Sequence, residues 1–173
     1  MARRSGSDRP LLLLDVDGVL NVLGPGPGCR MRDVVAGGSV VRFRADLPDV
    51  LARLGKRFEL VWATTWESAA NDCLAEPFGL PALPQVSFSA HPETDWVGPD
   101  ETWKLPAVRE AVGDRPCAFL DDDLGQDAHA WARYRAASVP TLVLDVDPST
   151  GLTDADVERL LKFAASLGID RAA

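Results

Sequence analysis

Four consecutive leucines at positions 11–14, followed at once by Asp15, Val16, Asp17 and Gly18, constrain this chain more than any other feature. An apolar run this short, with no polar break, is typical of a strand buried on both faces of a parallel sheet. Because side chains alternate along a strand, Asp15 and Asp17 are expected on the same side. Buried carboxylates are costly unless they are paired. The stretch therefore predicts either a simple strand with an Asp-Gly turn or a cation site that handles phosphate.

Apolar runs and amphipathic stretches alternate along the rest of the chain. The predicted strands, of which the last is short, are 58–64, 116–120, 140–146 and 85–90. The predicted helices are 46–55, 66–75, 102–112, 126–137 and 153–167. The expected N-caps are Asp46 and Thr153, the latter with Asp156 in a capping box. A three-layer α/β/α sandwich with a central, mainly parallel, Rossmann-like sheet follows from this alternation.

Within that sheet, the strand before Asp15 is expected to lie between the strands that end at Thr64 and Asp121. Segment 34–43 surrounds a Gly37-Gly38 pair, which predicts a β-hairpin.

Polar side chains of three kinds follow the predicted strands or open a helix. Thr64 closes the second strand, and Asp121, Asp122 and Asp123 follow the third. Consecutive acids repel one another unless a cation is near. Lys104 stands at the start of a helix, where a positive charge is disfavoured, so another group is expected to hold it. Sites in parallel sheets lie beyond the carboxyl ends of the strands, which is where all of these residues are placed.

These stretches, in this order, resemble the four motifs of the haloacid dehalogenase-like (HAD) superfamily. The apolar strand with Asp-x-Asp-Gly-Val-Leu resembles the first motif, Thr64 the second, Lys104 the third, and the Asp121-Asp122 pair the fourth. Thr65 is the alternative to Thr64. The resemblance implies a phosphomonoester hydrolase that works through a covalent aspartyl-phosphate.

The same resemblance implies a role for each matched residue. Asp15 would be the nucleophile and Asp17 the proton donor and acceptor, while Thr64 and Lys104 would hold the phosphoryl group. Mg²⁺ would be held by Asp15, by the backbone carbonyl of Asp17, and by Asp121 or Asp122. The predicted hairpin resembles the flap that covers HAD active sites, and the insert between Thr64 and Lys104 is too short for a separate cap domain.

A finer resemblance is to the small HAD domains associated with RNA-repair proteins. It is carried by the run from Trp62 to Glu67, by Asn71, by Gly79-Leu80-Pro81 and by Trp131-Ala132. A capless site is open, so its phosphorylated substrate is expected to be a small molecule, a nucleotide or a polynucleotide end. Candidate substrate contacts are Thr65, Trp66 and Arg42. Trp66, Trp96 and Trp103 would either stack a base or pack against the rim of the site.

Two other functions remain open on the same residues. A response-regulator receiver domain also uses acids, Thr and Lys, but it lacks Asp-x-Asp-Gly and a later Asp pair. A catalytically silent HAD fold used as a binding module is the second alternative, although every expected catalytic residue type is present. The hydrolase and the silent binding module differ in whether phosphate is released from a bound substrate.

The composition of the chain limits which binding partners and which cellular environment are expected. The chain has 173 residues and a net charge of −8, which argues against an extended non-specific nucleic-acid surface. Three widely spaced cysteines favour a reducing, cytoplasmic setting over a disulfide framework. No membrane segment and no obligate protein partner are evident. We expect residues 1–9 to be a disordered tail and residues 10–173 to form a single HAD-like domain.

Overall fold

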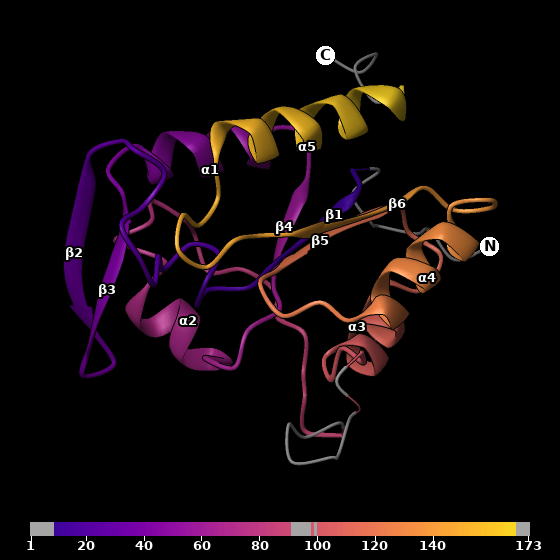
Figure 1. Ribbon diagram of the computed structural model, residues 1–173, viewed down its shortest axis with the longest axis horizontal. Helices are drawn as coiled ribbons and strands as arrows, with labels where there is room; N and C mark the ends of the chain where they lie inside the picture. Colours follow the sequence, from indigo (N-terminus) through magenta and orange to yellow (C-terminus); the bar gives the residue numbers. More distant parts are fainter. Residues whose placement is uncertain (1–8, 91–97, 99, 169–173) are drawn as a thin grey trace.

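A four-stranded parallel sheet forms the centre of the computed structural model, which describes residues 9–90, 98 and 100–168 (Figure 1). Its strands, in spatial order, are β4 (Glu59–Trp62), β1 (Leu11–Leu14), β5 (Cys117–Asp121) and β6 (Thr141–Asp145). Leu14 lies opposite both Trp62 and Leu120, so the carboxyl ends of the three strands are level. The sequence prediction that β1 lies between β4 and β5 is confirmed.

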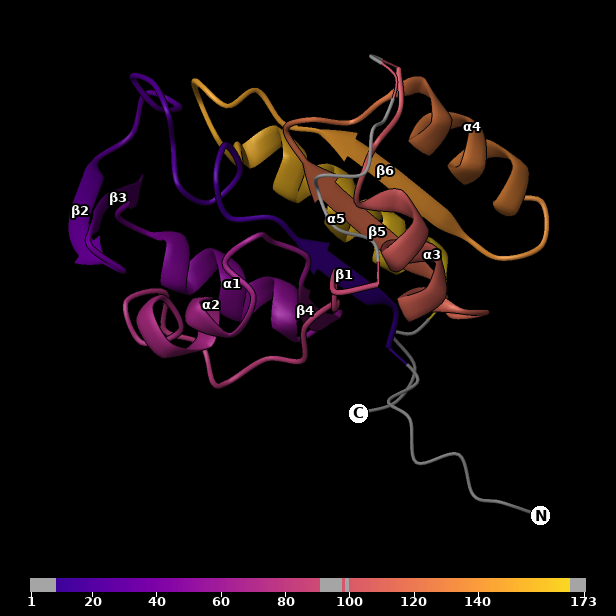
Figure 2. The same ribbon diagram turned by 90° about the horizontal axis from the view of Figure 1, so that it is seen from below.

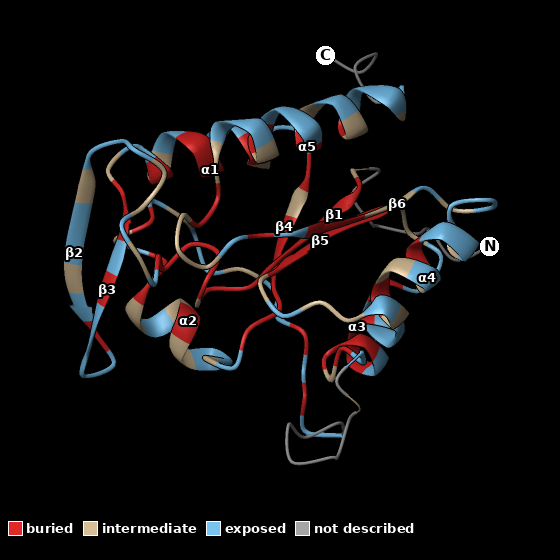
Figure 3. Ribbon diagram, in the orientation of Figure 1, coloured by how far each residue is buried: buried red, intermediate tan, exposed pale blue. Residues whose placement is uncertain are grey.

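Alternation of the leucines in β1 divides the hydrophobic core into two layers. Leu12 and Leu14 point into a cluster with α1 (Leu47–Gly55) and α5 (Asp154–Ser166). Leu11 and Leu13 point into the opposite cluster, with α3 (Leu105–Val112) and α4 (Gln126–Arg135). The strands of the sheet consist mostly of buried residues, while the outer faces of the helices are exposed (Figure 3). The predicted three-layer sandwich is therefore confirmed.

A two-stranded antiparallel hairpin, β2 (Met31–Ala36) and β3 (Ser39–Arg44), stands apart from the main sheet (Figure 2). It turns at Gly37-Gly38, as the sequence predicts, and both glycines have positive φ angles, which suit a tight hairpin turn. Val41 and Phe43 are buried in the first core cluster, which anchors the hairpin. The exposed outer face carries Val35 and its cross-strand partner Val40.

Several predicted elements are shorter than expected or differ in kind. Residues 85–90 form no strand, because Gln85 makes only an isolated bridge to Trp62. The helix predicted at 66–75 is α2 (Ser68–Cys73), and the one predicted at 102–112 begins at Leu105. Asp46 makes no side-chain cap, because its carboxylate binds the guanidinium of Arg44 at 2.7 Å instead. In contrast, Thr153 and Asp156 form the expected capping box of α5.

The described part of the segment between Thr64 and Lys104 contains α2 and irregular chain, with no separate cap domain. Most of the predicted tail at 1–9 lies outside the described residues, as does Trp96. Arg9 is described, and its guanidinium donates to the Gly55 carbonyl. No described helix combines the length and apolar character needed to cross a membrane.

Candidate active site

The ends of β1, β4 and β5 bring their polar residues to one edge of the sheet. Asp15 follows β1 directly, and its N–H donates to the Leu120 carbonyl at 3.2 Å. Asp121 is the last residue of β5, and Thr64 follows β4 after a single intervening alanine. Because parallel strands share a direction, these residues meet at the carboxyl edge, where α/β sheets place their ligand sites.

The turn after β1 lets Asp122 approach the Asp15–Asp17 loop. Gly18 has a φ of 76°, and a Cβ atom placed on it would lie 2.3 Å from the Asp122 carboxyl carbon. Any larger residue at this position would displace Asp122. Gly18 therefore serves both the left-handed turn and the close packing of Asp122 against the Asp15–Asp17 loop.

Lys104 connects two of the acids in a buried ion-pair network. Its Nζ lies 2.8 Å from Asp15 Oδ2 and 2.7 Å from Asp121 Oδ2, and all three side chains are buried. Burial opposes the charge on the ammonium group, but the carboxylates of Asp15 and Asp121 outweigh it and raise the pKa of Lys104. The two carboxylates thus explain why a lysine is retained at the start of α3, as the sequence predicts.

The carboxyl group of Asp15 is the most perturbed acid of this site. Burial is the main reason that its pKa is raised to about 7; Lys104 opposes this rise and the neighbouring Asp121 adds to it. Its Oδ1 accepts the N–H of Val16 at 2.7 Å, and its Oδ2 accepts from Lys104. Both contacts fix the side chain in one orientation.

Three carboxylates gather closely enough to hold one metal ion. Asp15, Asp121 and Asp122 each offer an oxygen within 4.8 Å of the others. Burial and the neighbouring Asp121 raise the pKa of Asp122, which indicates that negative charge accumulates here. With all three acids ionised, the cluster and its one lysine would carry a net charge of −2, which a divalent cation would neutralise. Oxygen donors of this kind are those that Mg²⁺ prefers, so the residues fit the ion that the sequence predicts.

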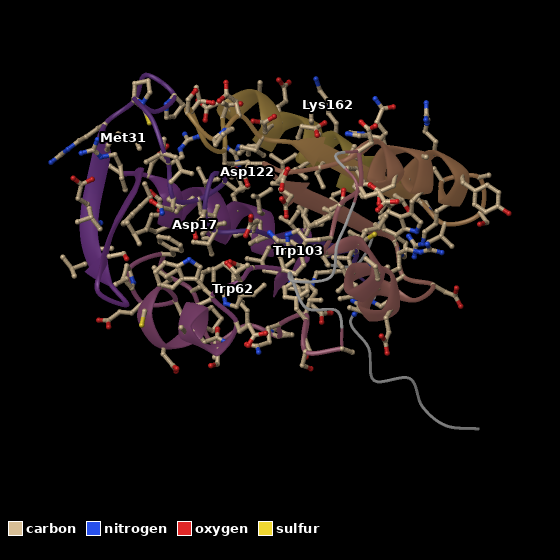
Figure 4. The ribbon with its side chains drawn as sticks, turned by 60° about the horizontal axis from the view of Figure 1, so that its bottom comes forward. Asp17, Met31, Trp62, Trp103, Asp122 and Lys162 are labelled. Atoms are coloured by element: carbon tan, nitrogen blue, oxygen red, sulfur yellow. The ribbon has the colours of Figure 1, made fainter. Side chains whose placement is uncertain are left out.

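Asp17 is held by a different set of contacts from Asp15. Its Oδ1 accepts Nδ2–H of Asn21 at 2.6 Å, and its Oδ2 accepts Nε1–H of Trp66 at 2.8 Å. Its carboxylate is not one of the three oxygens grouped around Asp15. In Figure 4, Asp17 and Asp122 lie near the middle of the molecule, between the hairpin and α4. The two acids of the Asp-x-Asp motif therefore occupy chemically distinct surroundings.

Thr64 is buried beside these acids, whereas Thr65 is exposed. The Thr64 Oγ1 accepts the backbone N–H of Trp66 at 3.3 Å. Because a hydroxyl that accepts one hydrogen bond can still donate its own proton, Thr64 remains able to donate to a substrate oxygen.

Other predicted substrate contacts are engaged elsewhere. The Arg42 guanidinium binds both oxygens of its cross-strand partner Asp33, at 2.8 and 3.0 Å, on the exposed hairpin. Trp103 packs against Phe88 with ring centroids 5.0 Å apart, and Lys104 Nζ lies 5.8 Å from its ring centroid. The packing interpretation therefore fits Trp103.

Sequence reasoning missed the residues that hold the catalytic candidates in place. Asn21 binds Asp17, and a second cluster joins the segment before Lys104 to the start of α4. In this cluster the Asp127 carboxylate accepts both the N–H and the hydroxyl of Thr102, at 2.9 and 3.0 Å, and the Thr102 hydroxyl accepts the Gly125 N–H at 2.7 Å. No sequence motif marks these partners, because each bond depends on the folded arrangement of separate loops.

Comparison with protein families gives one match that spans most of the chain. The model of the HAD domain in Swiss Army Knife RNA repair proteins matches residues 11–157. Comparison with curated proteins and with solved structures gives no match. The matched range begins at β1 and includes every residue of the site described above. The chain therefore belongs to the family of HAD domains found in Swiss Army Knife RNA repair proteins, within the HAD-type hydrolases.

Proposed function

We propose that this protein is a Mg²⁺-dependent phosphomonoester hydrolase that forms a covalent aspartyl-phosphate on Asp15. The observation that carries the proposal is the contrast between the two acids of the first motif. Asp15 is buried, contacts Lys104 and belongs to the acidic cluster, whereas Asp17 is held outside this cluster by neutral donors. Such a division suits one carboxylate as nucleophile and the other as proton carrier.

The proposed reaction has two steps. In the first, a carboxylate oxygen of Asp15 attacks phosphorus, the bond to the leaving oxygen breaks, and Asp17 gives its proton to that oxygen. In the second, Asp17 takes a proton from water as the water oxygen attacks the same phosphorus. The Asp15–phosphate bond then breaks, which releases inorganic phosphate and restores both side chains.

Lys104 and Thr64 are the residues we assign to the phosphoryl oxygens. Lys104 supplies a fixed positive charge next to Asp15, and Thr64 supplies a hydroxyl proton from the neighbouring strand end. Preorganised donors of this kind stabilise the charge that spreads over the transferring group. Both side chains are buried, so they are held without a large loss of side-chain freedom during the reaction.

Asp15, the backbone carbonyl of Asp17 and one of the Asp121–Asp122 pair would hold Mg²⁺. When bound, the ion would offset negative charge on the phosphoryl group. Either member of the pair would complete the set, because Asp121 and Asp122 each offer an oxygen to the acidic cluster around Asp15.

A phosphorylated polynucleotide end is the substrate class that we favour. The family name associates such domains with RNA repair, and a site without a separate cap can receive the end of a long molecule. The net charge of −8 suits contact with a strand end better than an extended nucleic-acid footprint. A nucleotide or a small phosphorylated metabolite is the alternative on the same site.

The proposal is tested by phosphate release in the presence of Mg²⁺. The panel comprises 3′- and 5′-phosphorylated oligonucleotides, mononucleotides, sugar phosphates and phosphopeptides, with Asp15→Asn as the matched control. We expect the parent protein to release phosphate from at least one class and Asp15→Asn to release none. A parent that binds the phosphorylated oligonucleotides but hydrolyses no member of the panel would instead support the silent binding module.

A further inference from the structure

We propose that Trp66 and Asn21 are positioning residues that orient the Asp17 carboxyl group for proton transfer, and that the β2–β3 hairpin holds both of them in place. The inference deepens the proposed function and rests on it, because Asp17 is the proton carrier only if the protein is a hydrolase of that kind. Its basis is that each oxygen of Asp17 has its own donor, and that each donor is anchored to the hairpin.

Asn21 fixes one side of the carboxyl group. Its Nδ2 donates to Asp17 Oδ1 at 2.6 Å, and its Oδ1 accepts the backbone N–H of Arg42, in β3, at 2.9 Å. A backbone N–H can only donate, so it requires the oxygen of the amide and directs the NH₂ group toward Asp17. Asn21 is buried, and its backbone carbonyl accepts the Gly18 N–H at 2.8 Å. The orientation of this amide is therefore set by the hairpin strand and the turn together.

Trp66 holds the other oxygen of the Asp17 carboxyl group. Its Nε1 donates to Asp17 Oδ2 at 2.8 Å, and an indole has no nitrogen lone pair with which to accept. The six-membered ring of the same indole lies against the hairpin turn, where a Cβ atom on Gly37 would approach within 3.0 Å of Cζ3. The φ angle of Gly37 is 55°, so the turn and the close approach both depend on glycine. The indole thus lies between the turn of the hairpin and the carboxyl group.

The backbone next to Trp66 carries strain. Glu67 has a φ of 45° and a ψ of −128°, and it is the only non-glycine residue with positive φ among those that the structure describes. Such a conformation costs about 1–3 kcal/mol and persists only where the surroundings enforce it. The Glu67 side chain is exposed. The strain is consistent with a chain that is bent to place the preceding indole.

Two donors leave the chemistry of Asp17 intact while they restrict its rotation. Each carboxyl oxygen has two acceptor positions, and the Asn21 and Trp66 hydrogen bonds occupy one on each oxygen. The other positions remain for the proton that Asp17 carries. A proton donor must lie within hydrogen-bond reach of the leaving oxygen, so a freely rotating carboxyl group would transfer its proton less efficiently.

The test is a double-mutant cycle between Trp66→Phe and Asp17→Asn, measured on aryl and alkyl phosphates that differ in leaving-group pKa. A poor leaving group needs a proton, so Trp66→Phe should slow single-turnover phosphoryl transfer to Asp15 from an alkyl phosphate roughly tenfold or more and leave transfer from a nitrophenyl phosphate almost unchanged. In the Asp17→Asn background, Trp66→Phe should have no further effect, because its action passes through Asp17. Trp131→Phe, a half-buried residue of α4 outside the site, is the matched control and should leave both rates unchanged.

If Trp66→Phe disturbs folding, incorporation of 3-benzothienylalanine at position 66 replaces the N–H by sulfur while keeping the shape of the indole. The same dependence on leaving group is expected. A uniform loss of the single-turnover phosphoryl-transfer rate on all substrates, or a full additional loss in the Asp17→Asn background, would overturn the positioning role while leaving the hydrolase proposal intact. Failure of the proposed function looks different, since the parent would then be inactive or Asp15→Asn would retain activity.

Discussion

Lys104 and Asp15 form a buried ion pair in which Nζ lies 2.8 Å from Oδ2. The same ammonium group lies 2.7 Å from Asp121 Oδ2, so one cation serves two buried acids. Burial alone would favour neutral side chains at these positions. The pairing holds three charged groups together at the carboxyl edge of the sheet, and it is the electrostatic basis of the proposed site.

Replacing Lys104 by Met should strongly destabilise the protein. Removal of one partner leaves buried carboxylates without compensation, which typically costs about 3–5 kcal/mol of unfolding free energy. Urea denaturation at pH 8 without Mg²⁺ measures the loss. The matched control is Lys162→Met, since Lys162 is exposed and forms a helical pair with Glu158, so a change within about 0.5 kcal/mol is expected. Equal effects of the two substitutions would contradict the network.

The stability of the metal-free protein should depend on the protonation of Asp15. Its pKa is about 7 in the folded protein and 3.8 as the ordinary value, so the folded state holds this proton more tightly. The stabilisation is complete below pH 3.8 and is lost as the pH rises through 7. Asp15→Asn lacks this titration, so its unfolding free energy relative to the parent should increase between about pH 4 and 7. A difference that stays constant over this range in urea titrations with EDTA would refute the assignment.

Much of the fold and of the acidic site was predictable from local patterns. The buried strands are uninterrupted apolar runs, and parallel strands bring their carboxyl ends together, which placed Asp15, Thr64 and Asp121 at one edge. Lys104 was predictable because its position at a helix start is unfavourable without a partner. These inferences needed only residue type, order and the direction of the strands.

Features that depend on which partner a side chain or strand finds in the folded protein were not predicted from the sequence. Asp46 is of a residue type that is favoured at helix N-caps, but its carboxylate binds the Arg44 guanidinium instead. Residues 85–90 contain alternating apolar side chains, yet their pairing with β4 is limited to the isolated bridge between Gln85 and Trp62. In contrast, the pairing of Arg42 with Asp33 could have been predicted, because a hairpin that turns at Gly37-Gly38 places position 33 opposite position 42.

The strained backbone at Glu67 gives a prediction about stability. Glycine adopts a φ of 45° without the steric cost that a Cβ atom imposes, so Glu67→Gly should raise the unfolding free energy. Relief of about 1–3 kcal/mol of strain outweighs the extra entropy of glycine in the unfolded chain, which leaves a gain of about 1 kcal/mol. Glu67→Ala keeps the Cβ atom and should give no gain. Thermal and urea denaturation that show the same change for both variants would argue against strain at this position.

The Thr102 hydroxyl should contribute measurably to stability. It accepts the Gly125 N–H at 2.7 Å and donates to Asp127, and Thr102 is buried. Thr102→Val keeps the shape but leaves the Gly125 N–H without this acceptor, so a loss of about 1–3 kcal/mol is expected. Thr65→Val provides the exposed counterpart, for which a change within about 0.5 kcal/mol is expected. Equal stabilities of the two valine variants would show that the cluster before Lys104 contributes nothing.

Intact-protein mass spectrometry of the Asp17→Asn variant, quenched during turnover of an activated aryl phosphate with Mg²⁺, tests the proposed mechanism most directly. An activated leaving group needs little protonation, so Asp15 should still be phosphorylated, while hydrolysis of the adduct should be slow without the Asp17 carboxylate. We predict one added phosphoryl group per chain, located on Asp15 by peptide mapping, and none in Asp15→Asn. Steady turnover by Asp15→Asn, or an adduct on any other residue, would contradict the proposal that Asp15 is the nucleophile.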